Sequence, residues 1–332
     1  MTRTALAIDI GGTKIAAGVV TDAGEVLVRA ETPTPARLGP DSIVAEAIRL
    51  GMSVLGMPVP GDSVPGTVRI DAVGVGSAGV IDDHGRVVSA TDILTDWAGT
   101  DLRARIGEAF GVPVLVVNDA HAHAVGEAVR GAGRGHETVL LVAVGTGIGG
   151  AVVVSGSPLV GAHGTAGHLG HLPTAAASGL VCSCGREGHL EPLSSGTGLP
   201  LLYRRLGGDA AVHDSREVVA RVRNDPIARE AVSTAASALG GAIGGLVNTV
   251  DPGVVIISGG MQNAGAYWWE CLRDGYHESV LPALDGTQLV PAVLSDDAAL
   301  IGASSLAITH ASVVAPAPDA TDAPTITEED ER

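Results

Sequence analysis

The feature that most constrains the fold is a strand, glycine turn, strand pattern that occurs once in each half of the chain. Residues 4–10 and 14–20 are apolar runs on either side of a glycine-containing turn, and residues 138–154 repeat the arrangement. A third apolar run, 254–257, also leads into two glycines. This repetition predicts two similar α/β halves whose glycine turns face each other across a cleft.

The length and composition also favour an α/β protein. The 332 residues are enough for two domains that each bury their own core. Apolar residues make up 45% of the chain but aromatic residues only 2%, so Val, Ala, Leu and Ile must build the core around many of the 47 glycines. Apolar periodicity predicts further strands at 25–30, 70–76 and 112–117, and helices at 41–55, 101–110, 120–129, 216–222 and 227–250.

The net charge of the chain disfavours some classes of binding partner. Twenty basic against 37 acidic residues give a net charge of −17, a field that repels nucleic acid and anionic lipid. A nucleotide can still bind, because backbone N–H groups and a magnesium ion hold phosphates locally. We therefore expect small-molecule ligands and no nucleic-acid or membrane partner.

The two ends and the most apolar stretch favour a cytoplasmic protein. The strand pattern begins within five residues of the N-terminus, where a secretory signal would need a basic and then an apolar segment. The stretch 139–154 is interrupted by four glycines and is too short for a membrane-spanning helix. From residue 315 the composition shifts to Pro, Ala, Thr and acids, so residues 315–332 are expected to form a disordered acidic tail.

The first glycine turn is a candidate phosphate site. Asp9-Ile10-Gly11-Gly12-Thr13-Lys14 lies directly between two predicted strands. Glycines there let backbone N–H groups approach an anion, and a carboxylate beside them can hold hydrated Mg²⁺. An ordinary glycine hairpin is the alternative. The P-loop and dinucleotide-fold patterns are absent from this segment, which makes those two interpretations weak.

The second glycine turn, Gly145-Thr146-Gly147-Ile148-Gly149-Gly150, strengthens the nucleotide hypothesis. Taken alone, such a turn is more often structural than functional. Paired with the first turn it can clamp a triphosphate from the opposite side, and Gly259-Gly260 can supply a turn beside the adenosine. The pair of turns therefore favours ATP bound between the two halves.

Two polar residues, Asn118 and Asp119, end the predicted strand 112–117. In phosphoryl transfer to a sugar hydroxyl, a carboxylate within hydrogen-bond reach of that hydroxyl accepts its proton, and Asp119 suits this role. The alternative is a helix N-cap for residues 120–129. Only together with the glycine turns does the catalytic interpretation prevail.

A histidine and cysteine cluster follows the second turn. His171, Cys182, Cys184 and His189 can close a tetrahedral zinc site, and a site with four protein ligands is structural. Glu191, held beside that site, is then able to hydrogen-bond a substrate hydroxyl. Cys271 lies apart and is predicted to be a buried, inert thiol.

In this order, D-I-G-G-T-K, N-D-A, G-T-G-I-G-G, G-H-x-x-x and C-x-C-G-x-x-G resemble the ROK family of repressors and sugar kinases over roughly residues 4–308. The resemblance implies an actin-like ATPase (ribonuclease H-like) fold with ATP, Mg²⁺ and a sugar between two α/β domains, beside a structural Zn²⁺. It implies that Asp119 is the catalytic base, and that the sugar contacts are Gly79, Asn118, Asp119, His168, His171 and Glu191. The implied nucleotide contacts are Asp9, Gly11, Gly12, Thr13, Lys14, Thr146, Gly147, Gly259 and Gly260.

The resemblance also sets expected domain limits and an expected assembly. The N-terminal domain is expected to span 1–118, with a helix at about 296–310 returning to it. The C-terminal domain is expected to span 119–295 and to carry the zinc loop 167–191. A homodimer is expected.

Three positions depart from the family pattern. His189 replaces a usual cysteine, which keeps a zinc ligand. Ile93, next to Asp92, stands where the family has a sugar-binding Asn four residues before the tryptophan that corresponds to Trp97, so one sugar hydrogen bond is in doubt. His168 stands where glucokinase-like members have Glu, and Ala-Gly-His-Leu-Gly-His is similar to the bacterial N-acetylmannosamine kinases.

These features predict an enzyme, an ATP-dependent kinase for the 6-hydroxyl of N-acetylmannosamine, with glucose as the alternative substrate. A sugar-sensing ROK repressor would need a helix-turn-helix ahead of the first strand and a basic surface. Only three residues precede Thr4, and the charge is strongly negative. A sugar-binding remnant without activity is disfavoured by Asp119 and both glycine turns, but Ile93 leaves this alternative open.

Overall fold

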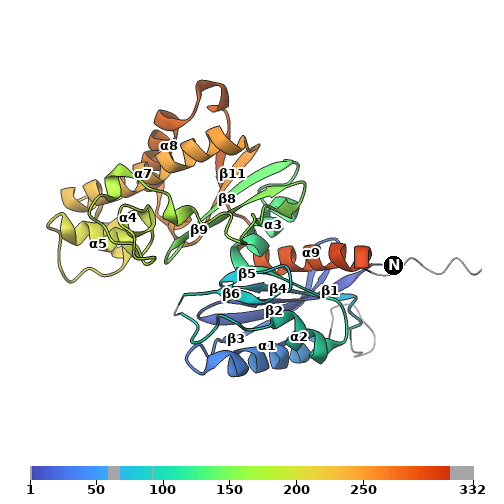
Figure 1. Ribbon diagram of the computed structural model, residues 1–332. Coiled ribbons are helices and arrows are strands. Elements are labelled where there is room, and N and C mark those ends of the chain that lie inside the picture. The colour runs from blue at the N-terminus through green and yellow to red at the C-terminus, as the bar shows by residue number, and fades with distance from the viewer. Residues whose placement is uncertain (1, 59–67, 92, 315–332) are drawn as a thin grey trace, which may run out of the picture.

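A computed structural model describes residues 2–58, 68–91 and 93–314. Asp92 and the predicted acidic tail lie outside the described residues. The described chain contains two five-stranded sheets, each covered by helices (Figure 1).

The first sheet has the strand order β3-β2-β1-β4-β7. Strands β1, β2 and β3 form an antiparallel meander, and β4 and β7 continue from β1 in parallel. Helices α1 and α2 cover one face and α9 covers the other (Figure 1). The bounds are β1 Thr4–Ile10, β2 Lys14–Thr21, β3 Val26–Pro33, α1 Gly39–Leu55, β4 Ala72–Ser77, α2 Leu102–Phe110, β7 Val114–Asn118 and α9 Ala298–Val314.

The second sheet repeats this plan with the order β10-β9-β8-β11-β12. An antiparallel hairpin again precedes parallel strands. One face packs on α7 and α8, and α3 packs on the other. The bounds are α3 Asp119–Arg130, β8 Thr138–Val144, β9 Ile148–Val154, β10 Ser157–Pro158, α7 Pro226–Val250, β11 Val254–Ser258, α8 Ala266–Ser279 and β12 Gln288–Pro291.

Short elements complete the chain around the sheets. The hairpin of β5 Val80–Ile81 and β6 Val87–Ser89 belongs to the first half, and α4 Glu191–Ser194, α5 Gly198–Arg205 and α6 Ser215–Arg221 lie between β10 and α7. Single turns of 3₁₀ helix occur at Leu169–His171, Ala175–Ala177, Gly260–Asn263, Pro282–Leu284 and Ser295–Asp297.

Helices α3 and α9 pack against each other between the two sheets (Figure 1). A Cβ atom on Gly302 of α9 would lie 1.8 Å from the Ala122 carbonyl oxygen of α3, and one on Gly126 of α3 would lie 2.0 Å from the Ala298 carbonyl oxygen. The two backbones are therefore in direct contact, which only glycine at these positions allows. This contact joins the helix that carries Asp119 to the helix that covers the first sheet.

Helix α7 is the one described helix long and apolar enough, by length and composition, to cross a membrane. Half of its most apolar window is buried inside the protein. Its buried side chains, from Ala228 to Val247, pack in one core with Leu140, Val255 and Tyr276. The apolar character of α7 is therefore explained by packing against the second sheet and α8.

The predicted strands and helices correspond to elements of the structure, and the α/β class is confirmed. Helices α4, α5 and α8 and strands β5, β6, β10 and β12 were not predicted from the sequence. The C-terminal helix begins at Ala298 and runs to Val314, rather than over 296–310.

Candidate active site

The first turn and Asp119 lie close together at the carboxyl ends of the parallel strands of the first sheet. Parallel register places Asp9 of β1 beside Gly76 of β4, and Gly76 beside Val117 of β7. A Cβ atom on Gly76 would lie 3.1 Å from Asp9 Oδ1 and 3.8 Å from Asp119 Cα. Three segments that are far apart in sequence thus bring two carboxylates to the carboxyl ends of β1 and β7, on either side of β4.

Asp9 has the chemistry expected of a cation ligand. Its Oδ1 is buried and has no hydrogen-bond partner among the described residues. Burial, and then the charge of Asp119, raise its pKa to about 7, while Lys14 acts in the opposite direction. An orphaned carboxylate oxygen in such a place fits a hydrated magnesium ion, which prefers oxygen ligands and needs few from the protein.

Asn118 makes the cap that the alternative interpretation predicted, and it makes a second contact as well. Its Oδ1 accepts from the amide groups of Ala120 and His121, at 2.9 and 3.3 Å. Its Nδ2 donates to the Gly79 carbonyl at 2.9 Å. Asp119 follows as the first residue of α3, and burial raises its pKa above the usual value. The cap therefore also sets the position of the candidate base.

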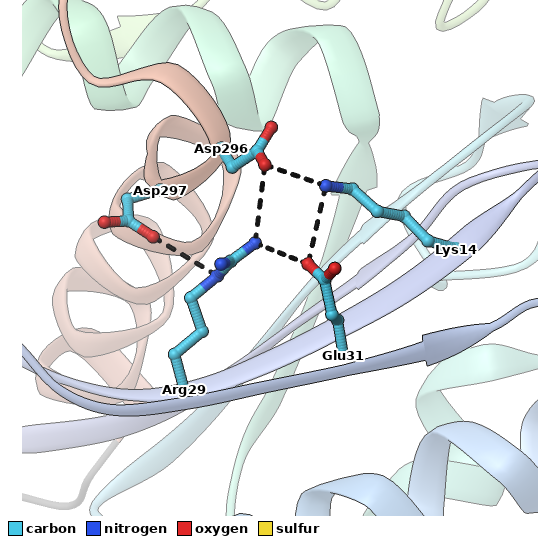
Figure 2. Close-up of polar contacts among 5 residues, drawn as sticks. All are labelled: Lys14, Arg29, Glu31, Asp296 and Asp297. Atoms are coloured by element: carbon cyan, nitrogen blue, oxygen red, sulfur yellow. Dashed lines mark hydrogen bonds and ion pairs between the residues drawn. The ribbon is translucent and has the colours of Figure 1, made fainter.

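Lys14 does not extend freely from the first turn. Its ammonium pairs with Asp296 at 2.9 Å and Glu31 at 3.6 Å (Figure 2). Arg29, on the neighbouring strand, contacts Asp296 and Asp297 in the same cluster. The cluster ties β2 and β3 to the turn that begins α9.

The second turn, between β8 and β9, is tied to the cysteine loop by Glu191. The carboxylate accepts from the Ile148 amide at 3.0 Å with Oε2 and from the Ser183 hydroxyl at 3.0 Å with Oε1. Sequence analysis predicted only a substrate contact for Glu191. The bridge escaped prediction because its partners lie 43 and 8 residues away, in separate loops.

A cavity of about 500 Å³ opens beside the second turn. Thr146 and Gly260, both predicted nucleotide contacts, lie in its wall. Gly145, which opens the second turn, also lines it. The remaining lining residues were not predicted from the sequence: Gly196, Thr197, His213, Asp214, Ser215, Arg216 and Met261. For Gly196 and Thr197, the glycine-containing run 194–198 offered a signal. A larger cavity of about 790 Å³ follows the edge strand β7, reaches the site only at Asn118 and His121, and contains no glycine-turn residue.

The four predicted zinc ligands come together. The candidate ligand atoms of His171, Cys182, Cys184 and His189 all lie within 4.8 Å of one another. His171 Nδ1 is 3.4 Å from Cys182 Sγ, and His189 Nδ1 is 3.3 Å from Cys184 Sγ. Such separations suit a tetrahedral zinc ion with bonds of about 2.0 to 2.3 Å, so the donor set fits the metal. Cys271 is buried apart from this cluster, as predicted.

Two of the three residues that depart from the family pattern, His168 and Ile93, lie at exposed positions. His168 is exposed beside the cluster, with its ring stacked 6.2 Å from that of His171. Ile93 is 56% exposed and lies against the first turn, where a Cβ atom on Gly12 would be 2.3 Å from Ile93 Cγ2. An apolar side chain thus lies where a polar sugar contact was expected.

Two similar sheets of this order, each with a glycine turn between its first two strands, define the actin-like ATPase fold. A profile of the ROK family matches residues 5–310. The chain belongs to the ROK family.

Relatives that are named as two different sugar kinases are about equally identical in sequence to this chain. Glucokinase of Thermotoga maritima is 30% identical over 315 residues, covering 91% of this chain and 96% of the relative. N-acetylmannosamine kinase of Escherichia coli O139:H28 is 33% identical over 305 residues, covering 92% and 98%.

Solved structures agree with the fold. The ROK hexokinase from Thermus thermophilus has a TM-score of 0.82 and 32% identity, covering 93% of this chain and 99% of the other. The ROK glucokinase from Streptomyces griseus, in complex with glucose and AMPPNP, has a TM-score of 0.73 and 29% identity, covering 92% and 99%.

Proposed function

We propose that this chain, an ATP-dependent sugar kinase of the ROK family, phosphorylates N-acetylmannosamine in preference to glucose. The observation that supports this preference is His168, exposed beside the candidate zinc site. The relatives do not decide between the two sugars, since both names occur at 30 to 33% identity.

The proposed reaction moves one proton and one phosphoryl group. Asp119 accepts the proton of the sugar 6-hydroxyl as its oxygen bonds to the γ-phosphorus of ATP, and the bond to the bridging oxygen breaks to release ADP. The glycine turns donate backbone N–H groups to the phosphates. Magnesium beside Asp9 neutralises the phosphate charge when bound.

The candidate zinc site affects sugar binding indirectly, because it fixes the position of the loop that carries the sugar contacts His168 and Glu191. His171 and His189 lie on either side of the segment from Pro173 to Gly188, so a metal held by the four residues would keep that segment compact. His168 precedes the first ligand by three residues, and Glu191 follows the last by two. Zinc binding is therefore coupled to the placement of both candidate sugar contacts.

His168 carries the sugar preference because of its hydrogen-bonding capacity. A glutamate offers only acceptors and suits bare hydroxyl donors, whereas a neutral imidazole offers one donor and one acceptor. The donor can serve the carbonyl of an N-acetyl group or an axial substituent at C2. Glucose is the second candidate, on the observation that His168 also stacks on His171 and could act there as packing alone.

We also propose the domain limits and the assembly. The first domain spans 1–118 and includes the C-terminal helix, the second spans 119–295, and the enzyme is a cytoplasmic homodimer. The molecular mass measured in solution tests whether the protein is a dimer.

The test compares kcat/KM for N-acetylmannosamine and glucose in the wild type and in His168→Glu. The substitution is expected to shift the ratio of the two values toward glucose by about tenfold or more, as expected for loss of one well-placed hydrogen bond to the N-acetyl group. His163→Glu is the matched control, because it adds the same charge at an exposed histidine of the same loop. A glucose preference in the wild type, unchanged in His168→Glu, would overturn the proposal.

A further inference from the structure

Helix α3 and its N-cap residue carry polar side chains that each reach a different part of the molecule. Asn118 contacts Gly79, His121 contacts Ala166, and His123 contacts Ser258. Glu127 accepts from the amides of the segment at 293–294. We propose that His121 and His123 are paired positioning residues on the helix that begins with Asp119. His121 holds the loop that begins at Ala166 and carries His168, called here the sugar loop. His123 holds the turn at Gly259-Gly260, called here the nucleotide turn. This inference rests on the proposed function.

His121 connects α3 to the loop that carries His168. Its side chain is only 4% exposed, and Nε2 lies 3.0 Å from the Ala166 carbonyl oxygen. Since a carbonyl only accepts, His121 must carry its proton on Nε2 and donate it there. Ala166 is two residues before His168, so the bond sets where the sugar loop begins.

The sugar loop has little freedom to move away from this bond. Gly167 has a φ of 93°, and a Cβ atom there would lie 2.2 Å from the Gly150 carbonyl oxygen of β9. The loop therefore crosses β9 in close contact immediately after Ala166. With one side against β9 and the other bonded to His121, the approach of His168 to the site is defined from both directions.

His123 connects α3 to the nucleotide side. Its Nε2 lies 2.9 Å from the hydroxyl of Ser258, which is 3% exposed and ends strand β11. The next residue, Gly259, packs so closely on Val144 that a Cβ atom would lie 2.5 Å from the Val144 carbonyl oxygen. Val144 is the residue before the second turn, and Gly260 lines the 500 Å³ cavity. The bond thus holds the two walls of that cavity at a set distance from α3.

The spacing of His121 and His123 on α3 lets the two side chains contact different parts of the protein. Residues two apart on a helix differ by about 200° around its axis, so His121 and His123 point to opposite sides. Asp119 lies one turn from His123 and two residues from His121. Burial lowers the pKa of both imidazoles, which favours their neutral forms beside Asp119.

The experiment measures KM for each substrate, and kcat, in His121→Ala and His123→Ala, each serving as the control for the other. His121→Ala is expected to raise the KM for the sugar about three- to tenfold with little change for ATP, and His123→Ala to do the reverse. His121→Gln and His123→Gln, whose amide nitrogen reaches the position of Nε2, should restore most of the loss. A helix that was merely destabilised would raise both KM values together in both variants.

Ser258→Ala provides a second route to the same contact. It removes the hydroxyl with the smallest change in volume, and it should reproduce the ATP effect of His123→Ala. The double variant His123→Ala/Ser258→Ala should be no worse than either single variant, because the two changes break one bond. Additive losses, or equal effects of both histidines on both substrates, would overturn the inference.

The inference and the proposed function fail in different ways. If the wild type prefers glucose, the sugar KM is measured with glucose and the comparison of the histidines is unchanged. If the wild type phosphorylates no hexose, the proposed function is wrong, and the affinity for AMPPNP, measured by calorimetry, decides. A weaker affinity in His123→Ala but not in His121→Ala then supports the inference, and equal affinities overturn it.

Discussion

At the scale of residues, Asp119 and Asp9 divide the proposed chemistry between them. Asp119 is the first residue of α3, and its position follows from the cap made by Asn118. Asp9 lies across Gly76 from it, with a buried oxygen that has no hydrogen-bond partner in the part of the chain that the structure describes. Burial raises the pKa of both carboxyl groups, which is the pattern expected where ligands or protons are exchanged.

We predict that Asp119→Asn lowers kcat by about 10² to 10⁴-fold, because the amide keeps the shape of the side chain but cannot accept the proton. Dissociation constants for sugar and AMPPNP should change much less. Steady-state kinetics and calorimetry make the comparison. A variant that keeps more than about a tenth of wild-type kcat would rule out Asp119 as the base.

A second residue-scale prediction concerns Asp9 in protein free of magnesium and nucleotide. Because its pKa rises from 3.8 to about 7 on folding, the folded state binds more protons than the unfolded state between these values. Stability attributable to Asp9 therefore falls as the pH rises from about 4 to about 7 and then levels off, by on the order of 3 kcal/mol.

The variant Asp9→Asn lacks this titration. Thermal unfolding should show it to be more stable than the wild type at pH 8, with the difference disappearing toward pH 4. Its affinity for magnesium and ATP should be reduced. Equal pH dependence of wild type and variant would contradict the burial argument.

At the scale of elements, sequence patterns predicted what is local and missed what is long-range. The two glycine turns, the strand end at Asn118 and the cysteine cluster each lie within a short stretch, where period and spacing carry the information. The contact of His123 with Ser258 joins residues 135 apart, and no local pattern encodes such a pair. Helix α8 was missed because its apolar face packs in the core around α7, a partner that appears only in the folded chain.

The cysteine loop gives the prediction that belongs to this scale. We predict one zinc ion per chain, and removal by a strong chelator should lower both the melting temperature and the affinity for sugar, because the metal organises the segment between His171 and His189. Cys184→Ala should do the same, whereas Cys271→Ala, at a buried thiol outside the cluster, should leave the metal content unchanged. Protein purified without chelator but devoid of zinc would count against the site, as would full activity of Cys184→Ala.

At the scale of the whole molecule, the two sheets meet through α3, α9 and the turn before α9. The charged cluster of Lys14, Arg29, Glu31, Asp296 and Asp297 connects that turn to β2 and β3 (Figure 2). These side chains are 30% to 65% exposed, so each ion pair contributes little, about 0 to 1 kcal/mol, to stability. The cluster orients the connection between the halves more than it stabilises them.

The most direct measurement of the central claim is ADP release by the purified protein with ATP, magnesium and a panel of hexoses and N-acetylhexosamines. We predict ATP-dependent turnover with the highest kcat/KM for N-acetylmannosamine and the next highest for glucose. A higher value for glucose would contradict the assigned role of His168, and no turnover with any sugar would contradict the account as a whole.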